Sequence, residues 1–471
     1  MDFQFYEEEL PIAKAIARAA DELGYPAFVI GGFVRDRIIN RPSKDMDVVC
    51  VGDGIKLAQK VSKILDVKQQ IVVFKRFGTA MLKLPEIELE FVGARKESYS
   101  QNSRKPEVEP GTIKDDQNRR DFTINALAIS LGAKNFGELV DPFDGVGDLG
   151  RRLVKTPLDP DKTFSDDPLR MMRAIRFATQ LDYDIDPVTL QGIKDNQHRL
   201  PIVSMERIMT ELNKIIVSPL PSKGLDLLSE TGLLAHILPE FEDLRGVEIR
   251  NGVGHKDNYY HTLAVLDNLA METEDLWLRW SAILHDIAKP PTKRFVAGTG
   301  WTFHGHEVVG ARWVPRIFKR LKLPLDNKMK FVQKMVRLHL RPISLTREDI
   351  TDSAMRRLLF DAGEDIDHLM MLCKADITSK NEAKVKRIKE NYEIVKQKLK
   401  EVEENDKIRN WQPPITGEII METFGISPSR EVGIIKDNIR EAILDGLISN
   451  QYEEAFNYML AEGAKLGLSK N

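Results

Sequence analysis

The chain has 471 residues, of which 42% are hydrophobic and 30% are charged, a composition typical of globular proteins with sizeable cores. Its net charge of −3 excludes a protein that is basic throughout, so nucleic-acid binding would have to use local patches. Its two cysteines exclude a disulfide framework, no apolar run approaches the roughly 20 residues of a membrane helix, and the first ten residues lack a secretion signal. We therefore expect a cytoplasmic protein of about three domains with no membrane contact.

The first part of the chain alternates helix and strand signals. Apolar residues at helical spacing predict a helix around residues 12–19. Short apolar runs predict strands at residues 27–30, 46–51, 70–74, 78–84 and 87–92. After about residue 155 helical periodicity dominates, including a long amphipathic helix over residues 385–402. The pattern predicts an α+β protein, in which a head with a small mixed sheet and helices precedes all-helical segments.

A glycine pair followed by two closely spaced aspartates forms the first candidate site. Gly31 and Gly32 end a predicted strand, and backbone N–H groups in such a turn can approach a phosphate. Asp45 and Asp47 lie two residues apart where the next predicted strand begins, and in an extended backbone they face the same side. Two carboxylates so close favour a bound cation such as Mg²⁺, which prefers carboxylate and phosphate oxygens. This layout suits nucleotidyl transfer, although each motif alone is more often an ordinary turn or a solvated loop.

Two later motifs add groups that suit a nucleotide. Glu90 lies on a predicted strand and can supply a third carboxylate, although an isolated acid there would more often be an exposed edge residue. Asp121 is a predicted helix N-cap, which would start a helix that carries Asn125 four residues later. Arg120 and its neighbour Arg119 match the charge of a triphosphate, and Asn125 can bond a ribose hydroxyl.

A third motif can read a base. Asp167 and Arg170 stand at positions i and i+3 at the start of a predicted helix, and offer an acceptor beside a donor. Adenine and cytosine present an amine donor beside a ring-nitrogen acceptor, whereas uracil and guanine present the opposite pattern. The pair therefore predicts selection of A and C, because a mismatched base leaves polar groups unpaired. The alternative is an ordinary salt bridge at a helix start.

Together, these motifs resemble the nucleotidyltransferase superfamily that contains CCA-adding enzymes (tRNA nucleotidyltransferases) and bacterial poly(A) polymerases. The resemblance extends over about residues 10–245 and is carried by residues 31–36, 45–47, 119–126, 166–170, 204–211 and 232–240. It implies that Asp45 and Asp47 bind two Mg²⁺ ions with Glu90 as a third acid, and that the partners are the tRNA 3′ end, ATP and CTP. The nucleotide-binding residues it implies are Gly31, Gly32, Arg35, Arg120, Asp121, Asn125, Asp167, Arg170, Arg173 and Arg176.

A second set of potential ligands follows in the order His261, His285, Asp286 and Asp376. Imidazole and carboxylate groups together suit a divalent transition metal, whereas a single buried histidine is more often structural. The order resembles the HD phosphohydrolase superfamily, which implies phosphatase or 2′,3′-cyclic phosphodiesterase activity, with Lys289 placing a substrate phosphate. Candidate ligands for a second metal are His304, His306 and His339.

We expect four segments with distinct roles. These are a catalytic head at residues 1–155, a nucleotide-selecting and RNA-binding neck at 156–245, an HD domain at 246–380 and a tRNA-binding helical tail at 381–471. The resemblance implies template-independent addition or repair of the tRNA 3′-CCA from CTP and ATP, with release of pyrophosphate. A poly(A) polymerase, an A-adding-only enzyme, a signalling nucleotidyltransferase with an HD hydrolase, and a phosphohydrolase with a silent head remain alternatives.

Two further stretches bear on these alternatives. Residues 98–114 resemble the family's mobile loop, whose presence favours addition of the terminal A, and the alternative is a plain connector. Residues 312–341 hold ten Lys or Arg and one acid. This stretch is either a solvated helix face or a track for an RNA backbone.

Overall fold

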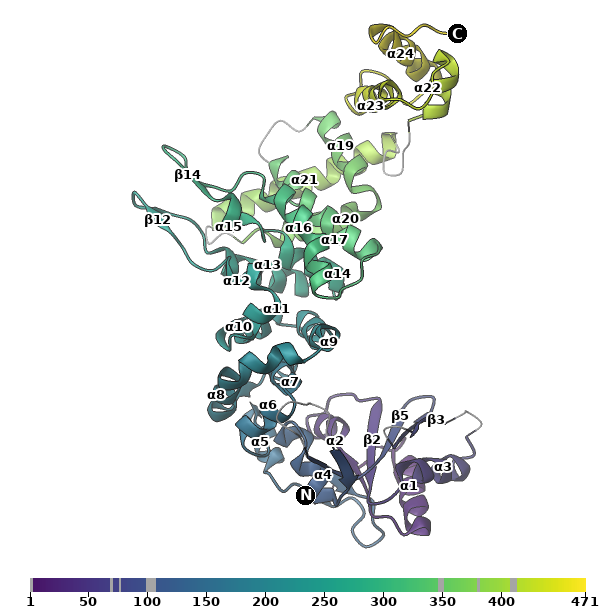
Figure 1. Ribbon diagram of the computed structural model, residues 1–471, viewed down its shortest axis with the longest axis vertical. Coiled ribbons are helices and arrows are strands. Elements are labelled where there is room, and N and C mark those ends of the chain that lie inside the picture. Colours follow the sequence, from purple (N-terminus) through teal and green to yellow (C-terminus); the bar gives the residue numbers. More distant parts are fainter. Residues whose placement is uncertain are drawn as a thin grey trace. The chain divides into compact units, whose positions relative to one another are not determined.

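The computed structural model describes residues 3–67, 71–75, 78–98, 107–345, 351–378, 382–406 and 413–471. The chain divides into two compact units, residues 1–238 and 239–471, each with its own buried core. Figure 1 follows them in chain order, from purple to teal and from teal to yellow. The first unit holds the large sheet and the second is mostly helical, so the predicted α+β class is confirmed. The finer division into four segments stays a prediction.

A seven-stranded mixed sheet organises the first unit. Its order is β3 (Val72–Phe74), β4 (Thr79–Lys83), β5 (Glu88–Gly93), β2 (Asp45–Cys50), β1 (Ala27–Ile30), β8 (Ala128–Ser130) and β9 (Leu139–Val140). Only β2 and β5 are parallel neighbours among these strands. Alternate residues of the central strands, such as Met46, Val48 and Phe91, are fully buried. The five predicted strands are present with small shifts at their ends, and residue 70 lies outside the described residues.

Helices flank this sheet and continue beyond it. They are α1 (Leu10–Leu23), α2 (Gly32–Ile38), α3 (Gly54–Ile64), α4 (Ile113–Asn118), α5 (Gly145–Arg151), α6 (Pro160–Asp166), α7 (Leu169–Leu181), α8 (Pro187–Asn196), α9 (Met205–Ile216), α10 (Pro221–Glu230) and α11 (Leu233–Ile237). The helix α7 packs on α9 and α10. The prediction of an all-helical neck at residues 156–245 is wrong in one detail. Strand β11 (Asp184–Ile185) lies within it and pairs in parallel with β10 (Leu153–Val154).

The predicted helix from Asp121 is also wrong. The structure has only a 3₁₀ turn, η2 (Thr123–Asn125), whose N-cap is Phe122. The Asp121 carboxylate instead accepts bonds from the Phe122 N–H and from the Asn125 side chain. It closes a local turn of its own, and such side-chain bonds compete with helix formation.

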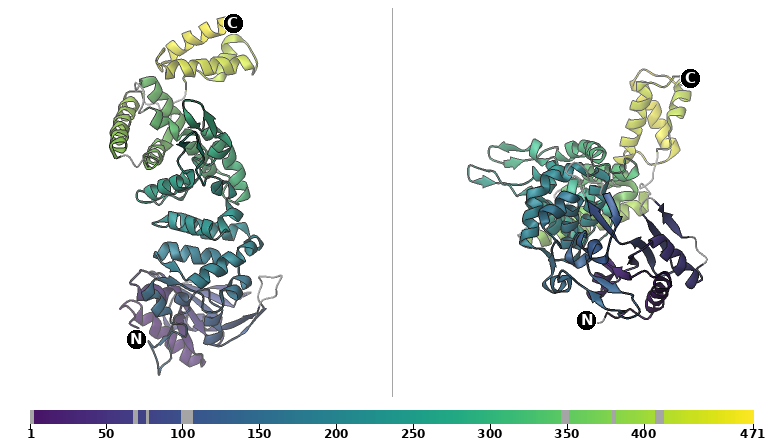
Figure 2. Two further views of the ribbon diagram at one scale, coloured as in Figure 1. Left: turned by 90° about the vertical axis from the view of Figure 1, so that its left-hand side faces the viewer. Right: turned by 60° about the horizontal axis from the view of Figure 1, so that its bottom comes forward.

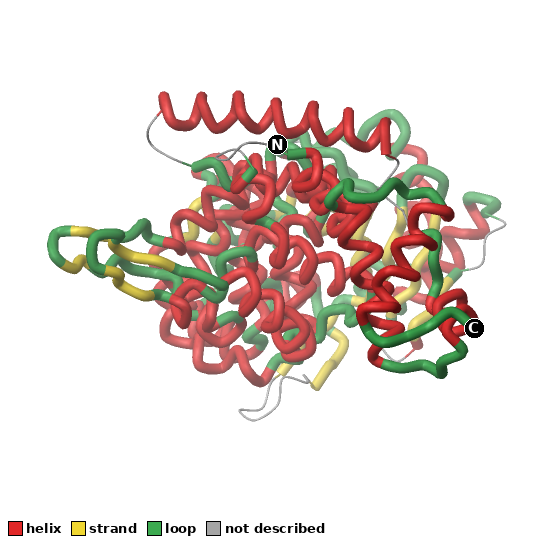
Figure 3. The backbone as a smooth tube through the Cα atoms, turned by 90° about the horizontal axis from the view of Figure 1, so that it is seen from above, coloured by secondary structure: helices red, strands yellow, loops and turns green. Residues whose placement is uncertain are grey.

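The second unit consists of helices and two short hairpins. Its helices are α12 (Pro239–Glu242), α13 (Asn258–Ala270), α14 (Leu276–Leu284), α15 (Lys289–Thr292), α16 (His306–Arg320), α17 (Asn327–Leu338), α18 (Leu340–Ser344), α19 (Asp352–Ala362), α20 (Ile366–Ala375), α21 (Glu382–Asp406), α22 (Gly417–Phe424), α23 (Arg430–Leu444) and α24 (Tyr452–Lys465). Figure 3 shows α21 as a long helix. Its Tyr392, Val395, Leu399 and Val402 are buried at helical spacing, which confirms the predicted amphipathic helix. Among the described residues, no helix combines the length and apolar character needed to cross a membrane.

The hairpins were not predicted. They are β12 (Ile249–Arg250) with β13 (Val253–Gly254), and β14 (Arg294–Val296) with β15 (Gly300–Thr302). Each strand has only two or three residues, too few for an alternating pattern to stand out in the sequence. Figures 1 and 2 show both hairpins extending away from the helices of their unit.

Candidate functional sites

Four carboxylates share one face of the sheet in the first unit. Because β2 and β5 are parallel with Asp45 beside Glu88 and Asp47 beside Glu90, all four side chains project from the same side. They line a cavity of about 520 Å³. Burial raises the pKa of Asp47 to about 6; Arg120 opposes this rise, while Glu90 and Asp45 add to it. A bound dication would relieve this repulsion, so the donor set fits Mg²⁺.

Glu88 was not among the predicted site residues. The signal that would have found it is its spacing of two residues from Glu90 on the same strand, since such residues share a face.

The glycine pair lies at the end of β1 beside these acids. Gly31 has φ +83°, and a Cβ there would lie 2.8 Å from Arg120 Nη1 and 3.4 Å from Asp47 Oδ2. Glycine therefore lets both charged side chains approach the backbone. The Gly31 N–H donates to the Leu127 carbonyl at 3.0 Å and so does not point at a phosphate. Gly32 begins α2 and lines the cavity.

Asp121 connects the cavity to helix α7. Its Oδ2 accepts from Arg173 Nε at 2.7 Å, and its Oδ1 accepts from Asn125 Nδ2 at 3.0 Å. Burial alone would raise the pKa of Asp121, but Arg173, the Asn125 amide and Arg170 bring it down to about 2. The ionised carboxylate thus holds two predicted nucleotide-binding side chains, those of Arg173 and Asn125, in place.

Two other predicted nucleotide-binding arginines form part of the cavity wall. Arg35 donates from Nη1 to Asn125 Oδ1 at 2.6 Å, and its guanidinium lies 4.9 Å from the centre of the Phe177 ring. Arg176 donates to Glu211 Oε2 at 2.5 Å, and burial lowers the pKa of this arginine. Both side chains therefore also hold the local structure together.

Asp167 and Arg170 line a second cavity of about 260 Å³, together with Arg207. Asp167 Oδ2 lies 3.6 Å from Arg207, and Arg170 donates to the Arg119 carbonyl at 2.5 Å. Each member of the pair therefore has its own partner. The two cavities share lining residues, which are Arg120, Asp121 and Arg173. A base held in one can thus belong to a nucleotide whose phosphates lie in the other.

Asp116 is a site residue that the sequence analysis missed. It is fully buried on α4, and its carboxylate contacts both Arg119 and Arg120, with Arg120 Nε at 3.2 Å. Arg119 and Arg120 follow the end of α4, three and four residues after Asp116, and that spacing was the available signal. Asp116 therefore holds the side chains of Arg119 and Arg120, both of which line the second cavity.

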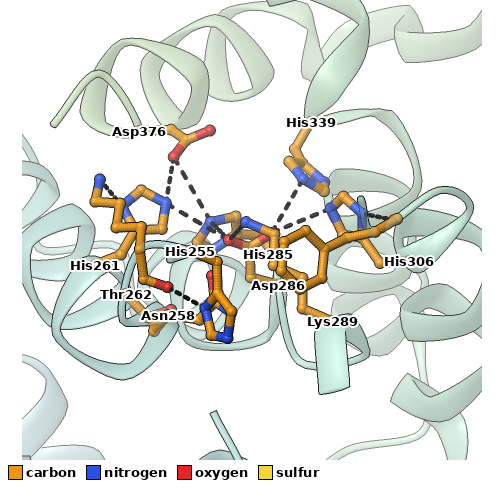
Figure 4. Close-up of polar contacts among 12 residues, drawn as sticks. His255, Asn258, His261, Thr262, His285, Asp286, Lys289, His306, His339 and Asp376 are labelled. Atoms are coloured by element: carbon orange, nitrogen blue, oxygen red, sulfur yellow. Dashed lines mark hydrogen bonds and ion pairs between the residues drawn. The ribbon is translucent and has the colours of Figure 1, made fainter. Parts of the chain in front are cut away.

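The second unit brings the predicted HD residues together (Figure 4). Asp376 Oδ1 lies 2.8 Å from His261 Nε2, and Asp286 Oδ2 lies 3.2 Å from His285 Nε2. His306 and His339 join from α16 and the end of α17, with Nε2 atoms 3.1 and 3.7 Å from Asp286 Oδ1. The ligand atoms form two triads, His261–His285–Asp286 and Asp286–His306–His339, each within 4.8 Å.

The histidine tautomers favour a metal. The Nδ1 atoms of His285, His306 and His339 each lie 2.7–2.8 Å from the carbonyl three residues earlier. A carbonyl only accepts, so each Nδ1 carries the proton and each Nε2 presents a lone pair. These three Nε2 atoms are buried without a hydrogen-bond partner. Metal-binding imidazoles commonly donate their other ring N–H to a backbone carbonyl in this way, so these residues fit a divalent metal.

The charges at this cluster distinguish its histidines: burial would lower the pKa of His285, but the neighbouring Asp286 and Asp376 raise it. Burial lowers the pKa of His339 to about 3, with the neighbouring His285 acting in the same direction, so this imidazole is neutral. Burial opposes ionisation of Asp286, but His285 and Lys289 hold its pKa well below the usual range. Lys289 Nζ lies 2.5 Å from Asp286 Oδ2. His304 is exposed, whereas His306 two residues later is buried in the cluster.

The expected loop at residues 98–114 is only partly described. Residues 99–106 lie outside the described residues, and the flanking parts form β6 (Arg95–Ser98) paired with β7 (Glu107–Pro110). The described ends are thus a strand pair and the start of α4, rather than a loop, because their backbone groups bond to each other.

The basic stretch at residues 312–341 is partly neutralised within its unit. Arg320 donates to both oxygens of Glu240 at 2.7 and 2.6 Å, and Lys334 lies 2.6 Å from Asp365. For these residues the structure favours a paired helix face over an RNA track.

The fold and the first site together define a nucleotidyltransferase head, and family models agree. Residues 27–155 match the poly A polymerase head domain, residues 182–244 a probable RNA and SrmB-binding site of polymerase A, and residues 258–381 the HD domain.

Similar proteins of known name identify the family within the nucleotidyltransferases. The A-adding tRNA nucleotidyltransferase of Deinococcus radiodurans is 31% identical over 353 residues, which cover 73% of this chain and 78% of the relative. The chain belongs to the tRNA nucleotidyltransferase family. The CCA-adding enzyme of Limosilactobacillus fermentum is 36% identical over 238 residues, 50% of this chain. That match spans only 57% of the relative's length.

Solved structures support the fold over nearly the whole chain. The Bacillus stearothermophilus CCA-adding enzyme in complex with CTP has a TM-score of 0.68 at 21% identity, covering 98% of this chain and 99% of that chain. The Thermotoga maritima CCA-adding enzyme complexed with tRNA has a TM-score of 0.61 at 21% identity, covering 97% and 96%.

Proposed function

We propose that this protein adds or repairs the 3′-terminal CCA of tRNA from CTP and ATP without a nucleic-acid template. The observation that carries the proposal is the junction of two cavities, one lined by carboxylates and the other by Asp167 and Arg170. A nucleotide spanning them would place its phosphates near the acids and its base near the selecting pair. The names of the relatives support the same reaction, and it belongs where tRNA and nucleoside triphosphates meet, in the cytoplasm.

In this reaction the terminal 3′ oxygen of the tRNA bonds to the α-phosphorus of the nucleotide. The bond from that phosphorus to the bridging oxygen breaks, pyrophosphate leaves, and the hydroxyl proton passes to solvent. Asp45 and Asp47, with Glu90, would hold Mg²⁺, which when bound activates the hydroxyl and neutralises the leaving group. Arg120 neutralises triphosphate charge. Asn125 keeps a second lone pair on its amide oxygen for a ribose hydroxyl.

Asp167 and Arg170 select the base in this proposal. Asp167→Ala should admit UTP and GTP more than it slows addition of the correct nucleotide, because it removes the acceptor and leaves the carboxylates intact. Glu206→Ala is the matched control, since Glu206 is an exposed acid on α9 beside Arg207. Equal losses with all four nucleotides in Asp167→Ala would argue against base selection.

A primer-extension gel tests the whole proposal. The protein with Mg²⁺ is given tRNA transcripts that end before CCA, after C and after CC, each with CTP, ATP, both, or UTP. Stepwise addition of C, C and A followed by a stop supports CCA addition. A long A ladder would instead indicate a poly(A) polymerase, and no extension would reject RNA tailing.

A-only addition is the second candidate. It is favoured by the A-adding enzyme of D. radiodurans, whose match covers 73% of this chain, against 50% for the CCA-adding enzyme of L. fermentum. The same gel separates the two, because an A-adding enzyme extends only the transcript that ends in CC, and by one residue.

We further propose that the HD cluster is a phosphatase or 2′,3′-cyclic phosphodiesterase. Divalent transition metals would be held by His261, His285, Asp286 and Asp376, and a second ion by Asp286 with His306 and His339. When bound, such ions lower the pKa of a coordinated water and polarise the phosphate. Lys289 would place the phosphate. Asp286→Asn should abolish hydrolysis of p-nitrophenyl phosphate and 2′,3′-cyclic AMP while CCA addition persists, and the reverse is expected of Asp45→Ala.

A further inference from the structure

The two hairpins of the second unit form one projecting element, here called the double hairpin (residues 247–256 and 293–303). Trp301 Nε1 donates to the Val253 carbonyl at 3.0 Å across the pair. A Cβ on Gly300 would lie 3.2 Å from Val253 Cγ1, so the hairpins are closely packed. In Figures 1–3 both extend together away from the helices of their unit.

The double hairpin and the segment joining it to the HD cluster are strongly basic. Residues 247–256 and 289–303 contain five cations and one carboxylate. The carboxylate, Glu248, is itself neutralised by Lys293, whose Nζ lies 2.7 Å away. Arg250, Lys256 and Arg294 are exposed. The charge complements a polyanion.

Four aromatic rings form a continuous series among these cations. Ring centres are 5.7 Å apart between Phe303 and His255, 5.5 Å between His255 and Trp301, and 5.2 Å between Trp301 and Phe295. All four rings are partly exposed. Stacking surfaces beside cations are what single-stranded nucleic acid binds, because every base has an aromatic face and every nucleotide a phosphate.

A cationic side chain lies beside the ring at each end of the aromatic series. Arg250 lies 5.1 Å from the centre of the Phe295 ring at the outer end. Lys289 Nζ lies 5.6 Å from the centre of the Phe303 ring at the inner end and 2.5 Å from Asp286 Oδ2. The series therefore runs from the hairpins to the acid shared by both ligand triads.

We propose that the double hairpin binds single-stranded RNA and leads its 3′ end to the HD cluster. The substrate class of that cluster is then an RNA chain with a terminal phosphate rather than a small free phosphoester. This rests on the proposed phosphoesterase activity. Exposed aliphatic residues such as Ile249 would also suit a protein partner, but the excess of cations favours RNA.

Hydrolysis by the full-length protein with Mn²⁺ tests the proposal. The two substrates are a six-nucleotide RNA with a 3′-phosphate and p-nitrophenyl phosphate, which has no bases to stack. Trp301→Ala should lower kcat/KM for the RNA about tenfold or more, with p-nitrophenyl phosphate unchanged within twofold. Trp301→Phe, which keeps a ring but loses the bond to Val253, should restore most of the RNA activity. Equal losses on both substrates would overturn the proposal.

Binding of the same RNA without metal tests the contact independently of hydrolysis. Arg250→Glu/Arg294→Glu should weaken binding and reduce the slope of log Kd against log salt by about 1.4, near 0.7 per phosphate contact. Arg312→Glu/Lys319→Glu, two exposed cations on α16, is the matched control and should bind as the wild type. If the wild-type protein does not hydrolyse p-nitrophenyl phosphate, the proposed phosphoesterase activity is wrong. The binding measurement alone then decides whether the double hairpin binds RNA. Unchanged binding in the hairpin variant, or an equal loss in the control, overturns it.

Discussion

Replacing Asp121 by Asn should destabilise the first unit by about 2 kcal/mol. The Asp121 carboxylate is buried and bonded to Arg173 and Asn125, and its pKa is lowered from 3.8 to about 2. A pKa that is lower in the folded than in the unfolded protein means that the ionised carboxylate stabilises the fold. Each pKa unit of this difference corresponds to about 1.4 kcal/mol in the free energy of unfolding. For a unit of 238 residues this predicts a fall in Tm of about 4–8 °C at pH 7.

Differential scanning calorimetry across pH tests the cause as well as the size. A depressed pKa stabilises the fold fully above the unfolded pKa near 4, and this stabilisation is lost as the pH falls towards 2. The difference in the free energy of unfolding between wild type and Asp121→Asn should therefore stay constant from pH 7 to pH 5. A gap that has already closed at pH 5, or one below about 0.5 kcal/mol at pH 7, would refute the reasoning. Asp144→Asn is the control, because the Asp144 side chain is exposed and its ion pair with Arg151 is solvated.

Three further outcomes are expected. Asp47→Asn should abolish nucleotide addition on the gel while the HD hydrolysis rate stays unchanged, and loss of both would contradict separate sites. Gly31→Ala should lower stability by about 2 kcal/mol, because its φ is +83° and a Cβ would meet Arg120; Gly150→Ala, in a helix with open space, should be neutral or stabilising in the same melt. His339→Gln should reduce the bound metal from two ions to one by elemental mass spectrometry, whereas an unchanged content would remove His339 from the ligands.

Local sequence patterns were sufficient for the elements that carry the first site. Short apolar runs predicted β2 and β5, and the two-residue spacing of Asp45 and Asp47 predicted their shared face. These features depend on residues close in the chain, because a strand sets the direction of each side chain from its own backbone. The order of His261, His285, Asp286 and Asp376 predicted a cluster, which the structure brings together.

Long-range packing decided what those patterns left open. Asp121 looked like a helix cap, yet its partner is Arg173, which lies 52 residues later on α7. His304, His306 and His339 were equivalent candidates by type, and only the packing of α16 and α17 buried two of them beside Asp286. The aromatic series of the double hairpin joins His255 to Trp301, far apart in sequence. Residue types and spacing therefore determined which chemistry the chain can carry, whereas tertiary contacts decided which side chains meet, because distant segments become neighbours only when their apolar faces pack together.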